Sequence, residues 1–406
     1  MPRIAITGLG CVSALGKSVA EFWDGLSRGR CGIGPLTLMA TDQLQIGIGA
    51  EAPAYDPACY FDLKRLSLLD RYSQFALIAA REAIEDARLD FAADGLARRT
   101  AVILGTGIGG ETTLDDAFFQ LYAQGNPRVH PAVIPRMMAS AATSHVTMEY
   151  GITGPAFTVT SACSSASHAI AQAMWMVRQG VVEAAITGGS EACFTLGTMK
   201  AWEAMRVMAP DTCRPFSSGR RGMVLGEGAG ILVIESFERA RRRNAKIYAE
   251  IAGAGMSSDA GHLIQPSEQG AVDAIEAALR DAQLTAGEIG YINAHGTGTA
   301  INDATETRAI RKVFGPQAPP VSSTKSMHGH ALGASGALEL IAATLAIGNG
   351  VIPPTVNFLG TDPACDLDCV PNQPRRADLR AALSNSFAFG GLNAVLALRR
   401  VEDLNS

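Results

Sequence analysis

The sequence predicts an α/β protein in which helices cover buried sheets. Short runs of β-branched residues alternate with amphipathic stretches along the 406 residues, and the chain carries 43 glycines, many of them at the ends of these runs. Hydrophobic residues make up 47% of the chain and charged residues 18%, which is typical of an enzyme with a large core. A chain of this length predicts two or three domain-sized units, or one large unit built twice.

The predicted strands fall into two series with similar features, which indicates an internal duplication. In each series the strands end in turns rich in glycine, serine and histidine, and amphipathic helices are expected at residues 70–87 and 270–282. We place the break near residue 245, with halves 1–245 and 246–406 that pack as one body. The predicted strands are residues 3–7, 100–104, 156–160, 184–187 and 231–235, then 247–252, 291–293, 321–323, 381–384 and 394–398.

Charge and cysteine usage exclude several classes of protein. The net charge is −5 and the one basic cluster, residues 238–243, is interpreted as an exposed helix end, so nucleic acid is not an expected partner. The N-terminus enters a strand directly and no uninterrupted apolar run is long enough to cross a bilayer, so neither a secretion signal nor a membrane span is expected. The eight cysteines are scattered without zinc-site spacing, which predicts no metal site and a reducing, cytoplasmic compartment.

Cys163 lies where a predicted strand turns into an alanine-rich helix, in the segment TVTSACSSASHAIAQAM. A thiol at a helix N-terminus is close to unpaired N–H groups and to the positive end of the helix dipole, which favour the thiolate. The same N–H groups can stabilise an oxyanion. The alternative interpretation is a buried structural cysteine, and the segment alone leaves both open.

Two further turns after predicted strands carry histidines. The segment NAHGTGT places His295 beside Thr297 and Thr299, which suits either a hydrogen-bonding catalytic group with a polar ligand or an ordinary turn histidine. The segment STKSMHGHALGASG holds Lys325, His328 and His330. Histidines at positions i and i+2 point in different directions, so we expect at most one of them to face a shared site. The nearby lysine is expected to orient that histidine or to shift its pKa.

Two glycine-rich turns need separate interpretations. NSFAFGGLN, residues 385–393, is either a mobile aromatic loop beside a pocket or a plain hydrophobic turn. GTGIGG, residues 105–110, follows a predicted strand and matches the dinucleotide fingerprint in its glycines. The expected acidic residue about 20 positions on is missing from AQGNPRVH, so we do not expect a nucleotide site.

Taken in order, these motifs resemble those of the elongating, Cys-His-His type of β-ketoacyl-[acyl carrier protein] synthase, in the thiolase-like superfamily. The resemblance covers nearly the whole chain: ITGLGCVSALG, GTGIGG, TSACSSASHAI, CRPFSSGRRGMVLGEGAG, MSSDAGH, NAHGTGT, STKSMHGHALGASG and NSFAFGGLN. It implies a thiolase-like five-layer α-β-α-β-α fold built from a duplicated half. It also implies an acyl carrier protein as partner, and a homodimer or a heterodimer with a second ketosynthase-like chain.

The resemblance assigns the reacting groups residue by residue. Cys163 matches the nucleophile that accepts the acyl group, and His295 and His330 match the two active-site histidines. Lys325 matches the lysine that supports the histidines, and Glu306 matches a structural acidic residue near the site. The chemistry implied is decarboxylative condensation of malonyl thioester with an acyl group on Cys163, with neither metal nor cofactor beyond the carrier's 4′-phosphopantetheine.

The resemblance also assigns the substrate-contacting groups. Thr297 and Thr299 match the threonines that contact the phosphopantetheine arm, and Ile108 matches a position that lines the acyl pocket. The backbone N–H groups of Cys163 and Phe389 match the oxyanion hole, and Phe389 also matches a gating phenylalanine of the acyl pocket.

Some positions depart from the usual elongating pattern. The common loop FGFGGTN has Ala388 and Leu392 here, and CRPFSSGRRG lacks the usual acidic residue before its glycine. These changes leave open a housekeeping fatty-acid synthase and a specialised one of nodulation, polyketide or polyene type. Two other functions stay as alternatives: a chain-length-setting partner subunit, which the intact Cys163 opposes, and a non-decarboxylative thiolase-like acyltransferase.

Overall fold

One mixed sheet of ten strands runs through the centre of the protein, in a computed structural model that describes residues 2–401. The strand order across the sheet is β10-β9-β13-β14-β8-β1-β7-β6-β4-β5. The strands are β1 (Ile4–Val12), β4 (Thr100–Gly105), β5 (Ala156–Val159), β6 (Ala184–Glu191), β7 (Gly228–Ser236), β8 (Ala249–Ser258), β9 (Tyr291–Asn293), β10 (Val321–Ser322), β13 (Ala381–Ala388) and β14 (Leu392–Arg399). Two small ribbons pair β2 (Gly34–Pro35) with β3 (Ile48–Gly49) and β11 (Val351–Ile352) with β12 (Arg375–Arg376).

The strand order repeats, which confirms the predicted duplication. In the first half β5, β4 and β6 are parallel, and β7 and β1 then add in antiparallel fashion. In the second half β10, β9 and β13 are parallel, and β14 and β8 add in the same antiparallel way. The halves join where β1 pairs with β8. Residue 245 lies in the connection from β7 to β8, and we propose it as the boundary between the halves.

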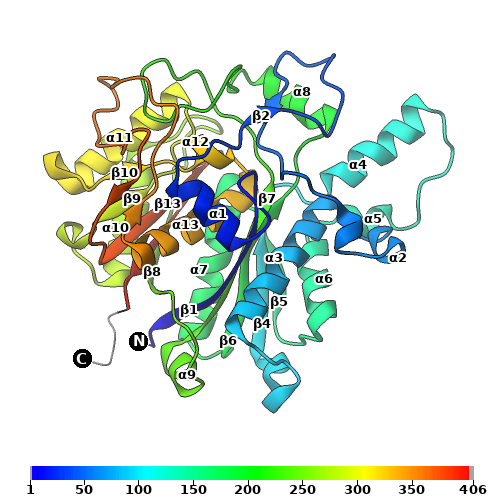
Figure 1. The fold of residues 1–406 in the computed structure, drawn as a ribbon, viewed down its shortest axis with the longest axis horizontal. Helices are drawn as coiled ribbons and strands as arrows, with labels where there is room; N and C mark the ends of the chain where they lie inside the picture. Colours follow the sequence, from blue (N-terminus) through cyan, green and yellow to red (C-terminus); the bar gives the residue numbers. More distant parts are fainter. Residues whose placement is uncertain (1, 402–406) are drawn as a thin grey trace.

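The helices form three layers that alternate with the two halves of the sheet (Figure 1). The long central helices α7 (Ser165–Arg178) and α13 (Ser335–Asn349) lie between the halves and contribute to one hydrophobic core. The first outer layer, α3 (Arg71–Ala87) and α6 (Ala141–Tyr150), covers the first half and shares a second core with it. The other outer layer, α10 (Glu268–Ala282) and α11 (Ala300–Phe314), covers the second half. This is the predicted five-layer α-β-α-β-α arrangement.

Shorter elements connect these layers and complete the chain. The remaining helices are α1 (Val19–Ser27), α2 (Leu63–Leu66), α4 (Glu111–Phe118), α5 (Val133–Met137), α8 (Leu196–Ala204), α9 (Phe237–Arg242) and α12 (Lys325–His328). The short turns of helix are η1 (Pro57–Cys59), η2 (Ala93–Arg99), η3 (Phe119–Ala123), η4 (Ala162–Ser164), η5 (Ala286–Glu288), η6 (Gly315–Gln317) and η7 (Leu332–Ala334). Figure 1 shows α4 and the segment after it extending away from the main body.

Strands β1, β6 and β8 extend further than predicted because glycines inside them look like turns in the sequence. In β1, a Cβ on Gly8 would lie 2.1 Å from the Ala83 carbonyl oxygen of α3, and one on Gly10 would lie 1.9 Å from that of Ala79. In β8, a Cβ on Gly255 would lie 2.1 Å from the Ala274 oxygen of α10. These glycines let an outer helix pack directly on the strand backbone.

The one long apolar stretch within residues 2–401 agrees with the expectation of no membrane span, and one further expectation needs correction. Residues Leu332–Asn349 are long and apolar enough to cross a membrane, yet 89% of this stretch is buried inside the protein, which makes it a core segment. The basic cluster at residues 238–243 is only partly an exposed helix end. Arg239 and Arg243 turn inward and form ion pairs with the buried carboxylate of Glu235 at the end of β7. The pairing neutralises a charge that burial would otherwise make costly.

Candidate active site

Cys163 lies in the short turn η4 between the edge strand β5 and the central helix α7. Ala162 takes φ +51°, a left-handed conformation that is uncommon for a residue with a side chain and turns the chain sharply before the nucleophile. The Ser165 hydroxyl holds this turn, because it donates to the Ala162 carbonyl oxygen at 2.6 Å and accepts from the Ser161 N–H at 2.9 Å. The thiol therefore sits at the start of α7.

Burial determines the charge of this thiol more strongly than the helix start does. Burial raises the pKa of Cys163 to about 11, while the Lys325 ammonium and a hydrogen bond from the Phe389 backbone N–H act in the opposite direction. The expectation that the helix start favours a thiolate is therefore outweighed in the free protein. The thiol is protonated at neutral pH, and its reaction has to remove that proton.

His295 follows β9 and is oriented by Lys325. The Lys325 ammonium donates to the His295 carbonyl oxygen at 2.6 Å and lies 3.3 Å from its Nδ1. An ammonium can only donate, so Nδ1 accepts and the ring proton is on Nε2. Burial, the Lys325 charge and His330 together hold the pKa of His295 well below its usual value, so the ring is neutral.

His330 lies between α12 and η7 and is oriented by the first residue of α13. Its Nδ1 is 2.8 Å from the Ser335 hydroxyl, and with that hydroxyl donating, the ring proton is again on Nε2. Burial also holds the pKa of His330 well below its usual value. His328 turns the other way, with its Nε2 3.0 Å from the Thr324 hydroxyl and its ring against Phe22, so only one of the two histidines faces Cys163.

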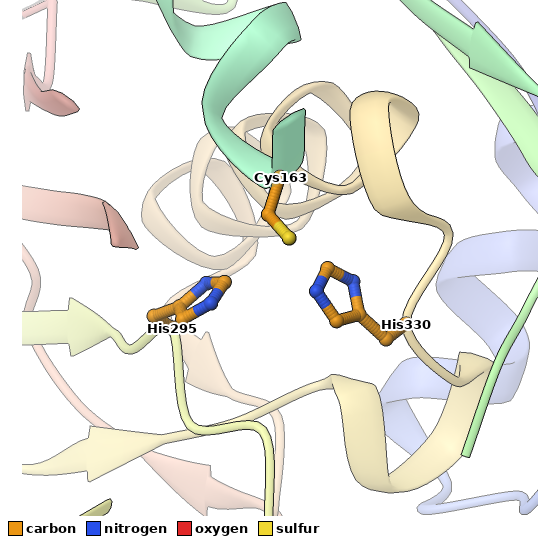
Figure 2. A group of neighbouring side chains, drawn as sticks. All are labelled: Cys163, His295 and His330. Carbon is orange, nitrogen blue, oxygen red and sulfur yellow. The ribbon is translucent and has the colours of Figure 1, made fainter. Parts of the chain in front are cut away.

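The three side chains converge from three different segments (Figure 2). The Cys163 sulfur and one ring nitrogen of each histidine lie within 4.8 Å of one another, and the two imidazole rings meet edge to face with their centroids 5.4 Å apart. One thiol and two imidazoles are also donors that zinc accepts. The buried Lys325 ammonium beside His295 opposes a cation at this point by charge repulsion, and the expectation of no metal stays a prediction.

A buried network supports the histidines from behind. The side chain of Lys325 is fully buried and forms an ion pair with the equally buried Glu339 of α13. The Glu306 carboxylate accepts from the backbone N–H groups of His295 and Gly296 at 2.9 and 2.7 Å and from the Asn385 amide at 3.1 Å. Glu306 thus fixes the turn that carries His295, and Lys325 fixes the ring.

A cavity of about 280 Å³ opens onto these groups. Thr297 and Thr299 line it with their hydroxyl oxygens 3.0 Å apart, and the Phe389 ring forms another part of the wall. The full lining is Cys163, Trp202, Arg206, Val207, Arg220, Arg221, Gly222, Met223, His262, Leu263, Ile264, Gln265, Pro266, His295, Thr297, Thr299, Ala300, Ile301, Asn302, His330, Phe387, Ala388, Phe389 and Gly391. The predicted residues Cys163, His295, His330, Thr297, Thr299 and Phe389 are therefore brought together.

The turn GTGIGG binds a carboxylate of the protein itself. Buried Glu191, at the end of β6, accepts from the N–H groups of Gly107 at 2.6 Å, Ile108 at 3.3 Å and Gly333 at 2.9 Å. These amides are therefore already occupied, in agreement with the interpretation that the turn is not a nucleotide site. Ile108 is 46% exposed and does not line the cavity, so its role in an acyl pocket stays a prediction.

Comparison with known families assigns the chain to one of them. The model of the beta-ketoacyl synthase N-terminal domain matches residues 1–240, and that of the C-terminal domain matches residues 248–359. The chain belongs to the beta-ketoacyl synthase family. It is therefore an enzyme of the acyltransferase class, as predicted. The synthase is 48% identical to nodulation protein E of Rhizobium sp. (strain N33) over 401 residues, which cover 98% of this chain and 99% of the relative.

Other relatives extend the comparison. The synthase is 40% identical to 3-oxoacyl-[acyl-carrier-protein] synthase 2 of Staphylococcus aureus (strain N315), over 98% of this chain and 99% of that protein. The ishigamide ketosynthase/chain length factor structure superposes with a TM-score of 0.95 and 38% identity, over 99% of this chain and 100% of that one. A type II polyketide ketosynthase solved with its acyl-carrier protein gives a TM-score of 0.90 and 33% identity, over 98% and 100% of the two chains.

Several residues that shape this synthase site escaped the sequence reasoning. Glu339 is the one acidic residue in the apolar helix α13, and a lone charge in such a run is a signal of a buried partner that could have been used. Ser335 and Glu191 gave no such signal, because serine and a strand-end glutamate are common in turns. Trp202 reaches the cavity from α8, in a segment that belongs to none of the motifs.

Proposed function

We propose that this synthase is a 3-oxoacyl-[acyl carrier protein] synthase that catalyses decarboxylative condensation of malonyl-carrier with an acyl group held on Cys163. The observation that carries the proposal is the convergence of Cys163 with two neutral imidazoles that both face one cavity. We assign both ring protons to Nε2, with Lys325 and Ser335 donating to the Nδ1 atoms. A thiol supplies the acyl acceptor, and two N–H donors supply a site for a developing negative charge.

The first half-reaction loads the enzyme. The Cys163 sulfur attacks the carbonyl carbon of an acyl thioester, the bond to the carrier sulfur breaks, and the thiol proton ends on the departing carrier thiol. The N–H groups of Cys163 and Phe389 are the proposed donors to the tetrahedral oxyanion. The N–H of Phe389 lowers the pKa of the Cys163 thiol, which supports this assignment.

The second half-reaction forms the carbon–carbon bond. The thioester oxygen of malonyl-carrier accepts Nε2–H bonds from His295 and His330, carbon dioxide leaves, and the electron pair of the broken bond forms an enolate. The enolate carbon attacks the acyl carbonyl on Cys163 and the thiolate leaves, which gives a 3-oxoacyl thioester two carbons longer. Neutral rings are suited to this role because they donate without a proton transfer, and the buried site strengthens each bond.

The proposed carrier is an acyl carrier protein, with no cofactor other than its phosphopantetheine arm. Thr297 and Thr299 offer hydroxyl groups along the cavity wall, and Arg206 adds positive charge to it. Arg220 and Arg221 also line the cavity, each in an ion pair with an aspartate. A phosphopantetheine arm carries hydrogen-bonding amides and a phosphate, which fit these two kinds of group. The related type II ketosynthase solved with its acyl-carrier protein supports this partner.

We further propose a specialised pathway and a dimer. Identity is 48% to nodulation protein E and 40% to 3-oxoacyl-[acyl-carrier-protein] synthase 2, and Ala388 and Leu392 depart from the common elongating loop. The ishigamide ketosynthase/chain length factor structure supports dimerisation, with either a second copy or a second ketosynthase-like chain. All eight cysteines are free thiols, which supports a reducing, cytoplasmic location.

Acylation and decarboxylation assays test the reaction. Incubation with an acyl-carrier should add the acyl mass to the peptide that contains Cys163, and Cys163→Ala should abolish this; equal labelling of the variant would refute the proposal. His330→Ala should reduce carbon dioxide release from malonyl-carrier more than it reduces acylation. Wild type that acylates but releases no carbon dioxide would instead be a non-decarboxylative acyltransferase, and a chain that turns over alone is not a chain-length-setting partner.

A further inference from the structure

The ring of Phe389 stacks on the ring of Trp202. The two ring centroids are 5.9 Å apart with an interplanar angle of 25°, and both side chains line the cavity at Cys163. The backbone N–H of the same Phe389 acts on the Cys163 sulfur and lowers the pKa of the thiol, and both residues line the cavity. One residue therefore touches Trp202 with its side chain and acts on the nucleophile with its backbone.

Phe389 lies in the short turn between β13 and β14, which is closed by a bond from the Gly391 N–H to the Ala388 oxygen at 3.0 Å. Gly390 and Gly391, which follow Phe389, take φ +84° and +69°, conformations open to glycine and costly for other residues. Two backbone bonds tie the loop to the segment after β8, from the Gly390 N–H to the Leu263 oxygen at 2.6 Å and from the Asp259 N–H to the Gly391 oxygen at 2.9 Å. Leu263 itself is 75% exposed, so this segment is a weak support.

Helix α8 gives Trp202 a much firmer base. The Thr195 hydroxyl caps its N-terminus by accepting the Thr198 N–H at 3.2 Å. Near its C-terminus, the Glu203 carboxylate accepts the N–H groups of Gln45 and Ile46 at 2.6 and 2.7 Å. Trp202 also packs against a buried cluster of Leu36, Cys193, Phe194, Met199, Met208, Met223, Leu225 and Leu332.

We propose that Trp202 is a positioning residue for the oxyanion hole: by stacking on Phe389 it holds the Phe389 N–H at Cys163. The effect of Trp202 on acyl transfer rests on the proposed function, whereas its effect on the pKa of the Cys163 thiol does not. Without the stack, the glycine-rich loop is free to rotate Phe389 and to withdraw its N–H. The thiolate and the tetrahedral oxyanion then lose the same donor.

Three variants separate this role from a structural one. Trp202→Leu keeps an apolar side chain and removes the stack, Trp202→Phe keeps an aromatic ring, and Trp23→Leu changes a half-buried tryptophan of α1 outside the cavity. The rate of Cys163 alkylation by iodoacetamide, followed by peptide mass across pH, reports the thiol pKa. We expect Trp202→Leu to move the alkylation profile upward by about half to one pH unit. Trp202→Phe and Trp23→Leu should both keep the wild-type profile.

Steady-state turnover with acyl- and malonyl-carrier gives the second readout. Removing an oxyanion donor lowers kcat, so we expect a roughly tenfold or greater fall in Trp202→Leu with little change in KM, and recovery in Trp202→Phe. A wild-type alkylation profile in Trp202→Leu overturns the proposal, and so does a Trp202→Phe variant as impaired as Trp202→Leu. Failure of the wild type to form acyl-Cys163 would refute the proposed function, while the alkylation result would still decide the role of Trp202.

Discussion

Cys163, His295 and His330 are all buried, and burial moves the pKa of each toward its neutral form. The two histidines share one fixed cation, because the Lys325 ammonium is close enough to oppose a second positive charge on either ring. The site therefore rests as one thiol and two N–H donors, with the buried pair of Lys325 and Glu339 behind them. A neutral site of this kind stabilises charge that appears only during the reaction.

Ser335→Ala tests the orientation of His330. With the serine hydroxyl donating to Nδ1 at 2.8 Å the ring proton is on Nε2, and loss of the hydroxyl frees the ring to present an acceptor to the cavity. We expect malonyl decarboxylation to slow by roughly tenfold, the equivalent of about one hydrogen bond, while acylation of Cys163 changes little. Carbon dioxide release and acyl-peptide mass measure the two steps. An equal loss in both steps would show that Ser335 acts on the fold and not on His330.

His328→Asn tests how burial of a neutral histidine links stability to pH. Burial and the Lys325 charge lower the pKa of His328 to about 3, against the opposing effect of backbone hydrogen bonds, whereas the pKa is about 6.5 in an unfolded chain. The unfolded chain therefore takes up a proton below pH 6.5 that the folded protein refuses. The contribution of neutral His328 to the free energy of unfolding is fully present above pH 6.5. It is lost as the pH falls toward 3, by about 1.4 kcal/mol per pH unit.

The stability difference between wild type and His328→Asn isolates that one group. Urea unfolding at pH 8, 6 and 5 should show the wild type losing stability relative to the variant only below pH 6.5. Comparing the two proteins cancels the buried carboxyls, such as Glu306 and Glu339, whose pKa values burial raises to about 6 and about 7. A difference that stays constant across these pH values would contradict the prediction.

At the scale of elements, the turns before the two central helices have the same design. In η4 Ala162 takes φ +51° and the next residue is Cys163, and in η7 Leu332 takes φ +41° and the next residue is Gly333. The duplication thus places a glycine in the second half where the first half has the nucleophile. That glycine is needed because a Cβ on Gly333 would lie 2.1 Å from the Gly107 nitrogen, in the turn that binds Glu191.

Gly333→Ala should therefore destabilise the protein. The contact is with backbone, which cannot rotate away, so we expect a loss of about 1–3 kcal/mol or more in urea unfolding, with lower activity as η7 shifts His330. Gly348→Ala, near the end of α13, is the matched control because a Cβ at that position would meet no atom within 4 Å. That change should raise helix stability by about 0.5–1 kcal/mol. Equal stability of the two variants would refute the steric argument.

Much of this element pattern could be predicted because strand and turn signals are local. β9 matches the predicted residues 291–293, and the turns after β5, β9 and β10 hold the residues expected to react. Strand ends at glycines could not be predicted, since Gly8 and Gly253 give the same signal as a turn and only the approach of α3 and α10 shows otherwise. Contacts such as Lys325 with Glu339, or Trp202 with Phe389, depend on packing between distant segments and carry little local signal.

At the scale of the whole molecule, the active site is assembled between the duplicated halves. Cys163 comes from the first half through α7, whereas His295 and His330 come from the second half through β9 and the turn before α13. The central helices carry two of these three groups at adjacent ends, since η4 and η7 precede α7 and α13. Neither half can form the site alone, which explains why the two halves pack through one continuous core.

The free edge of the sheet favours the proposed dimer. β5 ends the sheet, and within residues 2–401 no strand pairs with its outer side. Phe157 on this strand is 40% exposed, and Met148 of α6, at 66%, and Ile134 of α5, at 63%, are exposed large apolar side chains on the helices that precede it in the chain. Exposed edges with apolar side chains are sites of strand pairing and association. We therefore expect the wild type to have twice the 42.4 kDa mass of the chain.

Phe157→Asp should disrupt that dimer, because it places a charge on the edge strand where apolar surface would be buried. Light scattering after size exclusion should show the single-chain mass. Acylation should fall as well, because Cys163 follows β5 by a few residues and a shift of β5 would move it. Leu359→Asp is the matched control: Leu359 is 69% exposed in the second half, so this variant should remain a dimer with full activity. A Phe157→Asp protein that keeps the wild-type mass would place the interface elsewhere. A wild-type chain that is monomeric alone, and reaches the larger mass only with a second ketosynthase-like chain, would establish the heterodimer.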